Sequence, residues 1–128
     1  MPIIIDGWNF IRCDSSRIDD DGDRSIESVV ELIAYLEDFQ KFRGDPIVLV
    51  FDSTREYLGI DWQNTEKLKV IASRNADNYI KKYIDAVPER QRRNLRVVSS
   101  DSDVYYYAKS AYAEPLKSEE FWKKLDKR

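Results

Sequence analysis

The sequence of 128 residues contains no histidine and only one cysteine, Cys13. The lack of histidine excludes Ser-His-Asp and Cys-His catalytic sites and every zinc site that uses imidazole ligands. A single cysteine excludes an intrachain disulfide and a four-cysteine zinc site. A metal ion bound to this chain would therefore have oxygen ligands, which are typical of Mg²⁺, Mn²⁺ and Ca²⁺.

Glycine and long apolar runs are also scarce. The four glycines, at positions 7, 22, 44 and 59, form neither a GxGxxG motif nor a P-loop. Asp6 follows the first apolar run directly, so the N-terminus does not resemble a signal peptide, and no run is long enough to cross a membrane. We therefore expect a cytoplasmic protein without membrane contact. The composition, 42% hydrophobic and 35% charged, predicts a single domain over residues 1–128.

Short apolar runs alternate with helical patterns, which predicts an α/β sandwich with a mostly parallel sheet. The first two runs are continuously apolar, as in strands buried on both faces, whereas the third alternates and is expected at an edge. Long polar connections are expected over residues 10–23 and 53–66. The predicted strands cover residues 3–5, 47–51, 68–72 and 95–98. The predicted helices cover 26 to about 44, 76–87, 104–110 and 119–125, with Ser25 and Ser118 as N-caps.

The two halves of the chain carry opposite net charge. Residues 1–64 hold 6 basic and 14 acidic side chains, net −8, whereas residues 65–128 hold 15 basic and 10 acidic, net +5. The basic residues are densest between Lys67 and Arg96. This segment is either a solvated surface or a face that contacts the phosphates of a nucleic acid.

Aspartates follow the predicted strands at the points where the strands end. Asp6, Asp52 and Asp77 come after the first three strands, and Asp101 and Asp103 come after the fourth. Because the carboxyl ends of parallel strands share one edge of a sheet, these acids are expected to cluster there. Each acid taken alone is equally well explained as a helix cap or a first-turn residue. Together they predict a divalent cation site suited to metal-assisted attack of water on a phosphodiester.

Four segments with these acids resemble the NYN domains, which are PIN-like ribonucleases, and in particular their YacP-like branch. The segments are Ile3–Phe10, Val48–Asp52, Ala76–Ile80 and Val97–Asp101. The resemblance covers nearly the whole chain. It implies a PIN-like, Rossmann-like three-layer α/β sandwich with a four- to five-stranded sheet, a Mg²⁺ or Mn²⁺ site at the acidic edge, and cleavage of RNA.

The resemblance also implies roles for individual residues. Asp6, Asp77 and Asp101 match the catalytic, metal-binding acids of the family. Asn9 matches the polar residue that supports the first acid, and Asp52 matches an acid of more structural role. Two differences stand out, because Asn78 replaces a common second acid and Asp103 adds one that is expected to replace it in the metal site.

The sequence therefore predicts a metal-dependent endoribonuclease. The metal ligands are Asp6, Asp77, Asp101 and Asp103, supported by Asn9, Asp52 and Asn78. The predicted RNA contacts are Trp8, Arg74, Lys81 and Lys82, with Tyr57 or Trp62 as further stacking residues. The alternative is a non-catalytic PIN-like module that binds RNA, the ribosome or a protein partner, and a homodimer is compatible with either hypothesis. A third hypothesis is a toxin-like nuclease held by an inhibitor protein.

Overall fold

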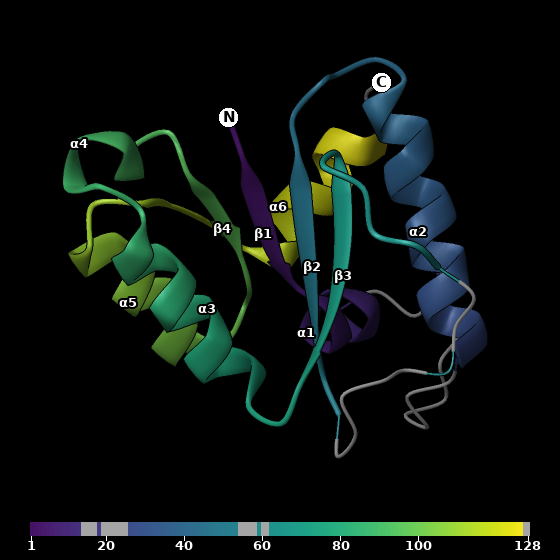
Figure 1. Cartoon of the computed structure of the whole chain (residues 1–128), viewed down its shortest axis with the longest axis horizontal. Helices are drawn as coiled ribbons and strands as arrows, with labels where there is room; N and C mark the ends of the chain where they lie inside the picture. The colour runs from purple at the N-terminus through teal and green to yellow at the C-terminus, as the bar shows by residue number, and fades with distance from the viewer. Residues whose placement is uncertain (14–17, 19–25, 54–58, 60–61, 127–128) are drawn as a thin grey trace.

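The computed structural model describes residues 1–13, 18, 26–53, 59 and 62–126. Its strands form a parallel five-stranded sheet in the order β3-β2-β1-β4-β5 (Figure 1), which confirms the predicted α/β class. The strands are β1 (Ile3–Asp6), β2 (Ile47–Asp52), β3 (Leu68–Ser73), β4 (Arg96–Val98) and β5 (Glu114–Leu116). The helices are α1 (Gly7–Arg12), α2 (Ile26–Gln40), α3 (Ala76–Ala86), α4 (Glu89–Arg92), α5 (Ser102–Ser110) and α6 (Ser118–Asp126).

The sheet lies between two layers of helices (Figure 1). Helices α3 and α5 pack on one face, where Ile80 and Val104 join β-strand residues such as Val97 in one apolar cluster. Helices α1, α2 and α6 cover the other face, where Leu36 and Phe121 belong to a second cluster. This three-layer arrangement leaves the ends of the strands uncovered by the layers and available for a site.

The burial of the strands explains which of them the sequence predicted. All four residues of β1 and the first five of β2 are buried, so these strands are apolar without interruption. In β3, Leu68 is buried and Lys69 is exposed, as expected for the edge strand that it is. None of the helices in the described part of the chain is long and apolar enough to span a membrane.

Aromatic contacts attach the last helix to the first. The rings of Phe10 and Trp122 are stacked with centroids 4.2 Å apart. The Trp122 indole Nε1–H also donates to the main-chain oxygen of Phe10 at 2.8 Å. Helix α6 is thereby fixed against α1, directly beside the carboxyl edge of the sheet.

Three elements were missed by the sequence analysis, and several boundaries differ, most clearly that of α2, which ends at Gln40 rather than near residue 44. Helix α1 occupies the start of the connection expected from residue 10, because its short apolar run has no room to show a helical period. Strand β5 contains Pro115, which argues against a strand but is tolerated at the edge of a sheet. Helix α4 has only four residues. Helix α6 begins at Ser118 itself, whereas the predicted cap at Ser25 and the predicted stacking residue Tyr57 lie outside the described residues.

Candidate metal centre

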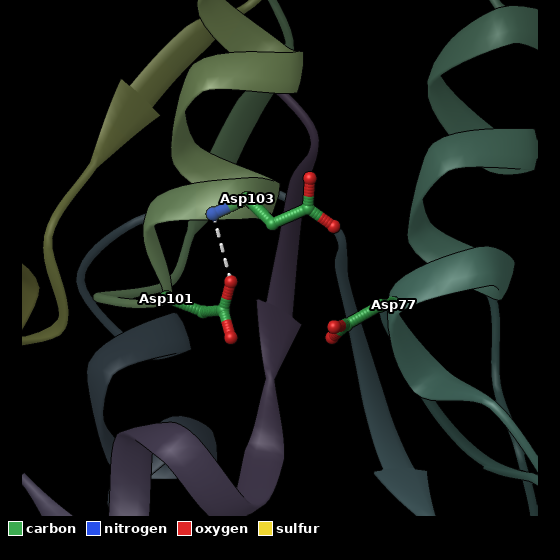
Figure 2. A group of neighbouring side chains, drawn as sticks. All are labelled: Asp77, Asp101 and Asp103. Atoms are coloured by element: carbon green, nitrogen blue, oxygen red, sulfur yellow. Dashed lines mark hydrogen bonds between the residues drawn. The ribbon is translucent and has the colours of Figure 1, made fainter.

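Three aspartates meet at the carboxyl edge of the sheet. Asp77 lies in the first turn of α3, and Asp101 and Asp103 lie at the start of α5. Figure 2 shows Asp77 facing the other two across the space between the helices. Each offers one carboxylate oxygen, and these three oxygens lie within 4.8 Å of one another. Oxygen donors alone suit Mg²⁺ or Mn²⁺, so the residues present fit the predicted metal.

The topology of the sheet brings these residues together. From the central strand β1 the chain proceeds outward to β2 and β3, and it then returns to the other side of β1 as β4. The strand order therefore reverses between β1 and β4, which is where ligands bind in open α/β sheets. Asp6 ends β1 and Asp101 follows β4, so both lie at this reversal.

Asp101 is both the N-cap of α5 and a member of the acidic group. Its Oδ1 accepts the main-chain N–H groups of Asp103 at 2.8 Å and Val104 at 3.4 Å. The first of these hydrogen bonds is the dashed line in Figure 2. The two explanations that the sequence left open for Asp101, cap and functional acid, are therefore compatible, since the cap uses one carboxylate oxygen and leaves the second.

Asp6 is the buried acid of the site, only 8% exposed. The group of three does not include it. Its Oδ2 accepts the Ser99 hydroxyl at 3.2 Å. Burial is the main cause that raises the pKa of Asp6 to about 7, and the negative charge of Asp77 is the next. The Ser99 hydrogen bond opposes this rise but does not cancel it. A nearby cation would relieve the penalty on the ionised form.

Asp77 experiences the same excess of negative charge. Loss of hydration raises its pKa first, and the charges of Asp101, Asp52 and Asp103 raise it further. Lys81 acts in the opposite direction, because its Nζ lies 2.7 Å from Asp103 Oδ2 and close enough to Asp77 to lower that pKa. The pair with Asp103 offsets part of the acidic charge without removing it.

The Asn9 side chain connects three segments at the carboxyl edge of the sheet. Its side-chain Oδ1 accepts the main-chain N–H of Ser100 and the hydroxyl of Ser118, each at 2.8 Å. Helix α1, the loop after β4 and the start of α6 therefore share one acceptor. The hydroxyl of Ser118 serves this network, although the sequence analysis assigned that residue to helix capping alone.

Asp52 positions α3 rather than joining the group of three. Its Oδ1 accepts the main-chain N–H of Ala76 at 2.6 Å, at the first residue of the helix that carries Asp77. Asn75 is the N-cap of α3, and its side chain accepts the main-chain N–H of Asn78. Asn78 thus contacts Asn75 through its backbone, while its side chain is exposed.

Gly7 allows α1 to approach the sheet beside Asp6. A Cβ atom at this position would clash with the ring of Phe51, so a larger residue would require the ring or the helix to move. The Asp6-Gly7 pair is therefore the sequence signal for this close contact.

The predicted RNA contacts fall into two groups. Arg74, between β3 and α3, and Lys82, on α3, are exposed, and Lys81 is half-buried against Asp103. Trp8, by contrast, is 5% exposed and its indole Nε1–H donates to the main-chain oxygen of Asp52 at 2.8 Å. Its ring packs edge-on against Phe51 in the core and is not presented for stacking on a base. We therefore exclude Trp8 from the RNA-contacting set.

Trp62 is also less accessible than stacking on an RNA base would require. Its side chain is half-buried and packs against the cluster of apolar residues under α1, α2 and α6. Two arginines of the basic segment are likewise engaged, since Arg92 donates to main-chain oxygens and Arg96 lies 3.8 Å from a Glu114 oxygen. The basic segment is not a single uniform surface.

Comparison with known proteins decides the family. The model of the YacP-like NYN domain matches residues 3–128. The chain belongs to the YacP-like NYN family. NYN domains are generally nucleases of the PIN-like superfamily, and the acidic group lies where such a site is expected. No curated protein sequence matches the chain.

Solved structures show the same fold. The crystal structure of Rae1 (YacP) from Bacillus subtilis matches with a TM-score of 0.81 at 20% identity, over 99% of this chain and 74% of that one. A tryptophan-to-leucine variant of the same protein matches with a TM-score of 0.79 at 19% identity, over 99% and 75% of the two chains. The PIN-like architecture of this YacP-like NYN domain is thus established independently of its sequence motifs.

Proposed function

We propose that this domain is a metal-dependent endoribonuclease that hydrolyses phosphodiester bonds of single-stranded RNA. The observation that carries the proposal is the group of three carboxylate oxygens within 4.8 Å of one another, held at the strand-order reversal of an NYN domain. Asp77, Asp101 and Asp103 would hold Mg²⁺ or Mn²⁺, and Asp6, at the end of β1, would add a further negative charge to the site. A bound cation of this kind would activate a water molecule and offset charge on the scissile phosphate.

Other residues would position the metal ligands or bind the RNA. Asp77 and Asp103 approach from different helices, and Asp101 keeps one oxygen on the α5 cap while the other faces the site. Asn9 and Asp52 act as positioning residues, because they fix the loop before α5 and the start of α3. Arg74, Lys81 and Lys82 would contact the phosphates that flank the reacting bond.

Cleavage of a labelled single-stranded RNA tests the proposal. Wild type, Asp77→Asn and the matched control Glu31→Gln, an exposed acid on α2, would be compared in Mn²⁺, in Mg²⁺ and in EDTA. We expect wild type and Glu31→Gln to cut in metal but not in EDTA, and Asp77→Asn to be inactive. Internal products from an RNA with blocked ends would establish endonucleolytic cleavage. Cleavage in EDTA, or full activity of Asp77→Asn, would overturn the proposal.

A further inference from the structure

A hollow lies at the opposite end of α3 and α5 from the acidic group. It has a volume of about 500 Å³ and is lined by Glu89, Arg90, Arg93 and Tyr112. The first three residues belong to α4 and its C-terminal end, at the upper left of Figure 1, and Tyr112 follows α5. Since α3 ends at Ala86, nine residues after Asp77, this end lies roughly 14 Å along the helix from Asp77.

The two arginines of the hollow are exposed and have no protein partner in the described part of the chain. Neither the Arg90 nor the Arg93 side chain makes a hydrogen bond or an ion pair there. Their neighbour Arg92 behaves differently, because it donates to the main-chain oxygens of Val87 and Asp85 and holds the turn before α4. With Glu89 included, the lining carries a net charge of +1, and both guanidinium groups are available to an anion.

Tyr112 is held in a conformation that usually selects glycine. Its φ is +67°, and it is the only non-glycine residue with positive φ in the described ranges. The cause is the end of α5, where the Ala113 N–H donates to the Ala108 oxygen at 3.0 Å and the chain turns through the left-handed region. The Tyr112 side chain is 68% exposed, so burial does not offset this backbone strain.

We propose that this hollow is a second contact site for single-stranded RNA, separate from the acidic site. The Tyr112 ring would stack on one unpaired base, and Arg90 and Arg93 would contact the phosphates beside it. Both α3 and α5 run from the acids to this hollow, so one extended RNA strand would reach both the acidic site and the hollow. This inference rests on the proposed function for the choice of RNA as ligand. An acidic peptide would satisfy the arginines but would leave the exposed aromatic ring without a matching group.

RNA binding by the intact chain in EDTA tests this inference without requiring cleavage. Fluorescence anisotropy would compare a single-stranded RNA of about ten nucleotides with one of about three. Tyr112→Gly removes the ring and suits the positive φ, so the fold is retained. Arg90→Gln with Arg93→Gln removes both guanidinium groups. The matched controls are Tyr106→Ala, whose ring is 61% exposed, and Lys41→Gln with Arg43→Gln.

We expect Tyr112→Gly to weaken binding of the longer RNA roughly 5-fold or more, as loss of one stacked base does. The arginine pair should lower the slope of log affinity against log salt by about 1.4, since each phosphate contact contributes about 0.7 on a single strand. An RNA of about three nucleotides still offers one base and its neighbouring phosphates to the hollow, so both changes should weaken its binding as well. Both control variants should bind as wild type does.

Three outcomes separate this inference from the proposed function. Unchanged binding of the longer RNA by both test variants overturns the inference, even if wild type cuts RNA. Weakened binding by both variants, together with no cleavage by wild type in Mn²⁺, supports the second contact site and rejects the ribonuclease proposal. Competition by polyglutamate as effective as that by RNA, with Tyr112→Gly unchanged, overturns the inference in favour of an acidic protein partner.

Discussion

The two ends of α3 and α5 hold charges of opposite sign in different ways. At the acidic end, Asp101 caps a helix and Asp6 is buried, so like charges are kept close by fixed hydrogen bonds. At the other end, Arg90 and Arg93 are exposed and unpaired within the described residues. Enforced proximity of carboxylates favours a small cation, whereas exposed guanidinium groups suit a flexible anion. The acidic end is thus preorganised, whereas the basic end is open.

The largest effect expected is loss of RNA cleavage when Asp101 loses its charge. Asn is as good an N-cap as Asp, so Asp101→Asn should leave the stability of α5 unchanged. It should reduce the rate of RNA cleavage about 1,000-fold, because stabilisation of the transition state by a metal ion is worth several kcal/mol. Asp101→Ala should lose cleavage similarly and also about 1 kcal/mol of unfolding free energy. Urea unfolding and single-turnover cleavage measure the two effects separately. Wild-type cleavage by Asp101→Asn would mean that the acidic end is only a helix cap.

A stability change with pH should reveal the buried acid. The pKa of Asp6 is about 7 in the folded chain and 3.8 ordinarily, so the folded protein keeps a proton that the unfolded chain releases between these values. The free energy of unfolding contributed by Asp6 should therefore fall as the pH rises from about 4 to about 7. Asp6→Asn should stabilise the metal-free protein at pH 8 by up to about 4 kcal/mol and have little effect at pH 4.

Urea unfolding in EDTA at pH 4, 6 and 8 measures this difference, with Glu31→Gln as the control for removal of one acidic charge. Added Mn²⁺ should stabilise wild type at pH 8, because a bound cation favours the ionised carboxylates. If wild type and Asp6→Asn show the same pH dependence, burial does not raise the pKa of Asp6.

Asn9 tests whether the acidic end depends on its supporting network. Asn9→Ala leaves the Ser100 N–H and the Ser118 hydroxyl without their shared acceptor, which should cost about 1 to 3 kcal/mol of unfolding free energy. Ser118→Ala, which removes one donor and leaves Asn9 with the other, should cost less. Thermal unfolding of both variants measures the order. Equal stability of Asn9→Ala and wild type would show that the loop before α5 is held by other contacts.

The smallest effect expected lies at the basic end, where Tyr112→Gly should raise stability. Glycine adopts positive φ without the steric cost that a side chain imposes, so the free energy of unfolding should increase by about 1 kcal/mol. Chemical denaturation measures the change, with Tyr106→Ala as a matched loss of an exposed ring. A clear loss of stability in Tyr112→Gly would mean that the ring has a packing role, which would weaken the contrast between the two ends.

The sequence predicted the centre of the fold because local patterns and burial agree there. Strands β1 and β2 are buried on both faces, so their composition alone identified them. The aspartates after the strands were expected to converge because parallel strands share a carboxyl edge, and Asp77, Asp101 and Asp103 do lie together. Strand β5 was missed because Pro115 is acceptable only at a sheet edge, a position that the sequence does not display.

What the sequence could not predict depends on contacts between distant segments. The burial of Trp8 is decided by its packing against Phe51, 43 residues away in the sequence. The shared acceptor at Asn9 joins residues separated by 91 and 109 positions. The hollow at Tyr112 likewise requires α4 and the end of α5 to meet in space. Residue spacing carries none of this information, whereas it does carry helix periods and strand ends.

Calorimetric titration with Mn²⁺ measures whether the acidic end binds a cation, on which the proposed site depends. Wild type, Asp101→Asn and Glu31→Gln would be titrated at pH 7.5, after urea unfolding has shown that all three are folded. If the acidic end is a cation site, wild type and Glu31→Gln should bind Mn²⁺. Asp101→Asn should bind it at least about 10-fold more weakly, since even the loss of a group that supports a metal ligand costs about that much. Equal affinity of wild type and Asp101→Asn, or no binding by wild type, would contradict a cation site at the acidic end.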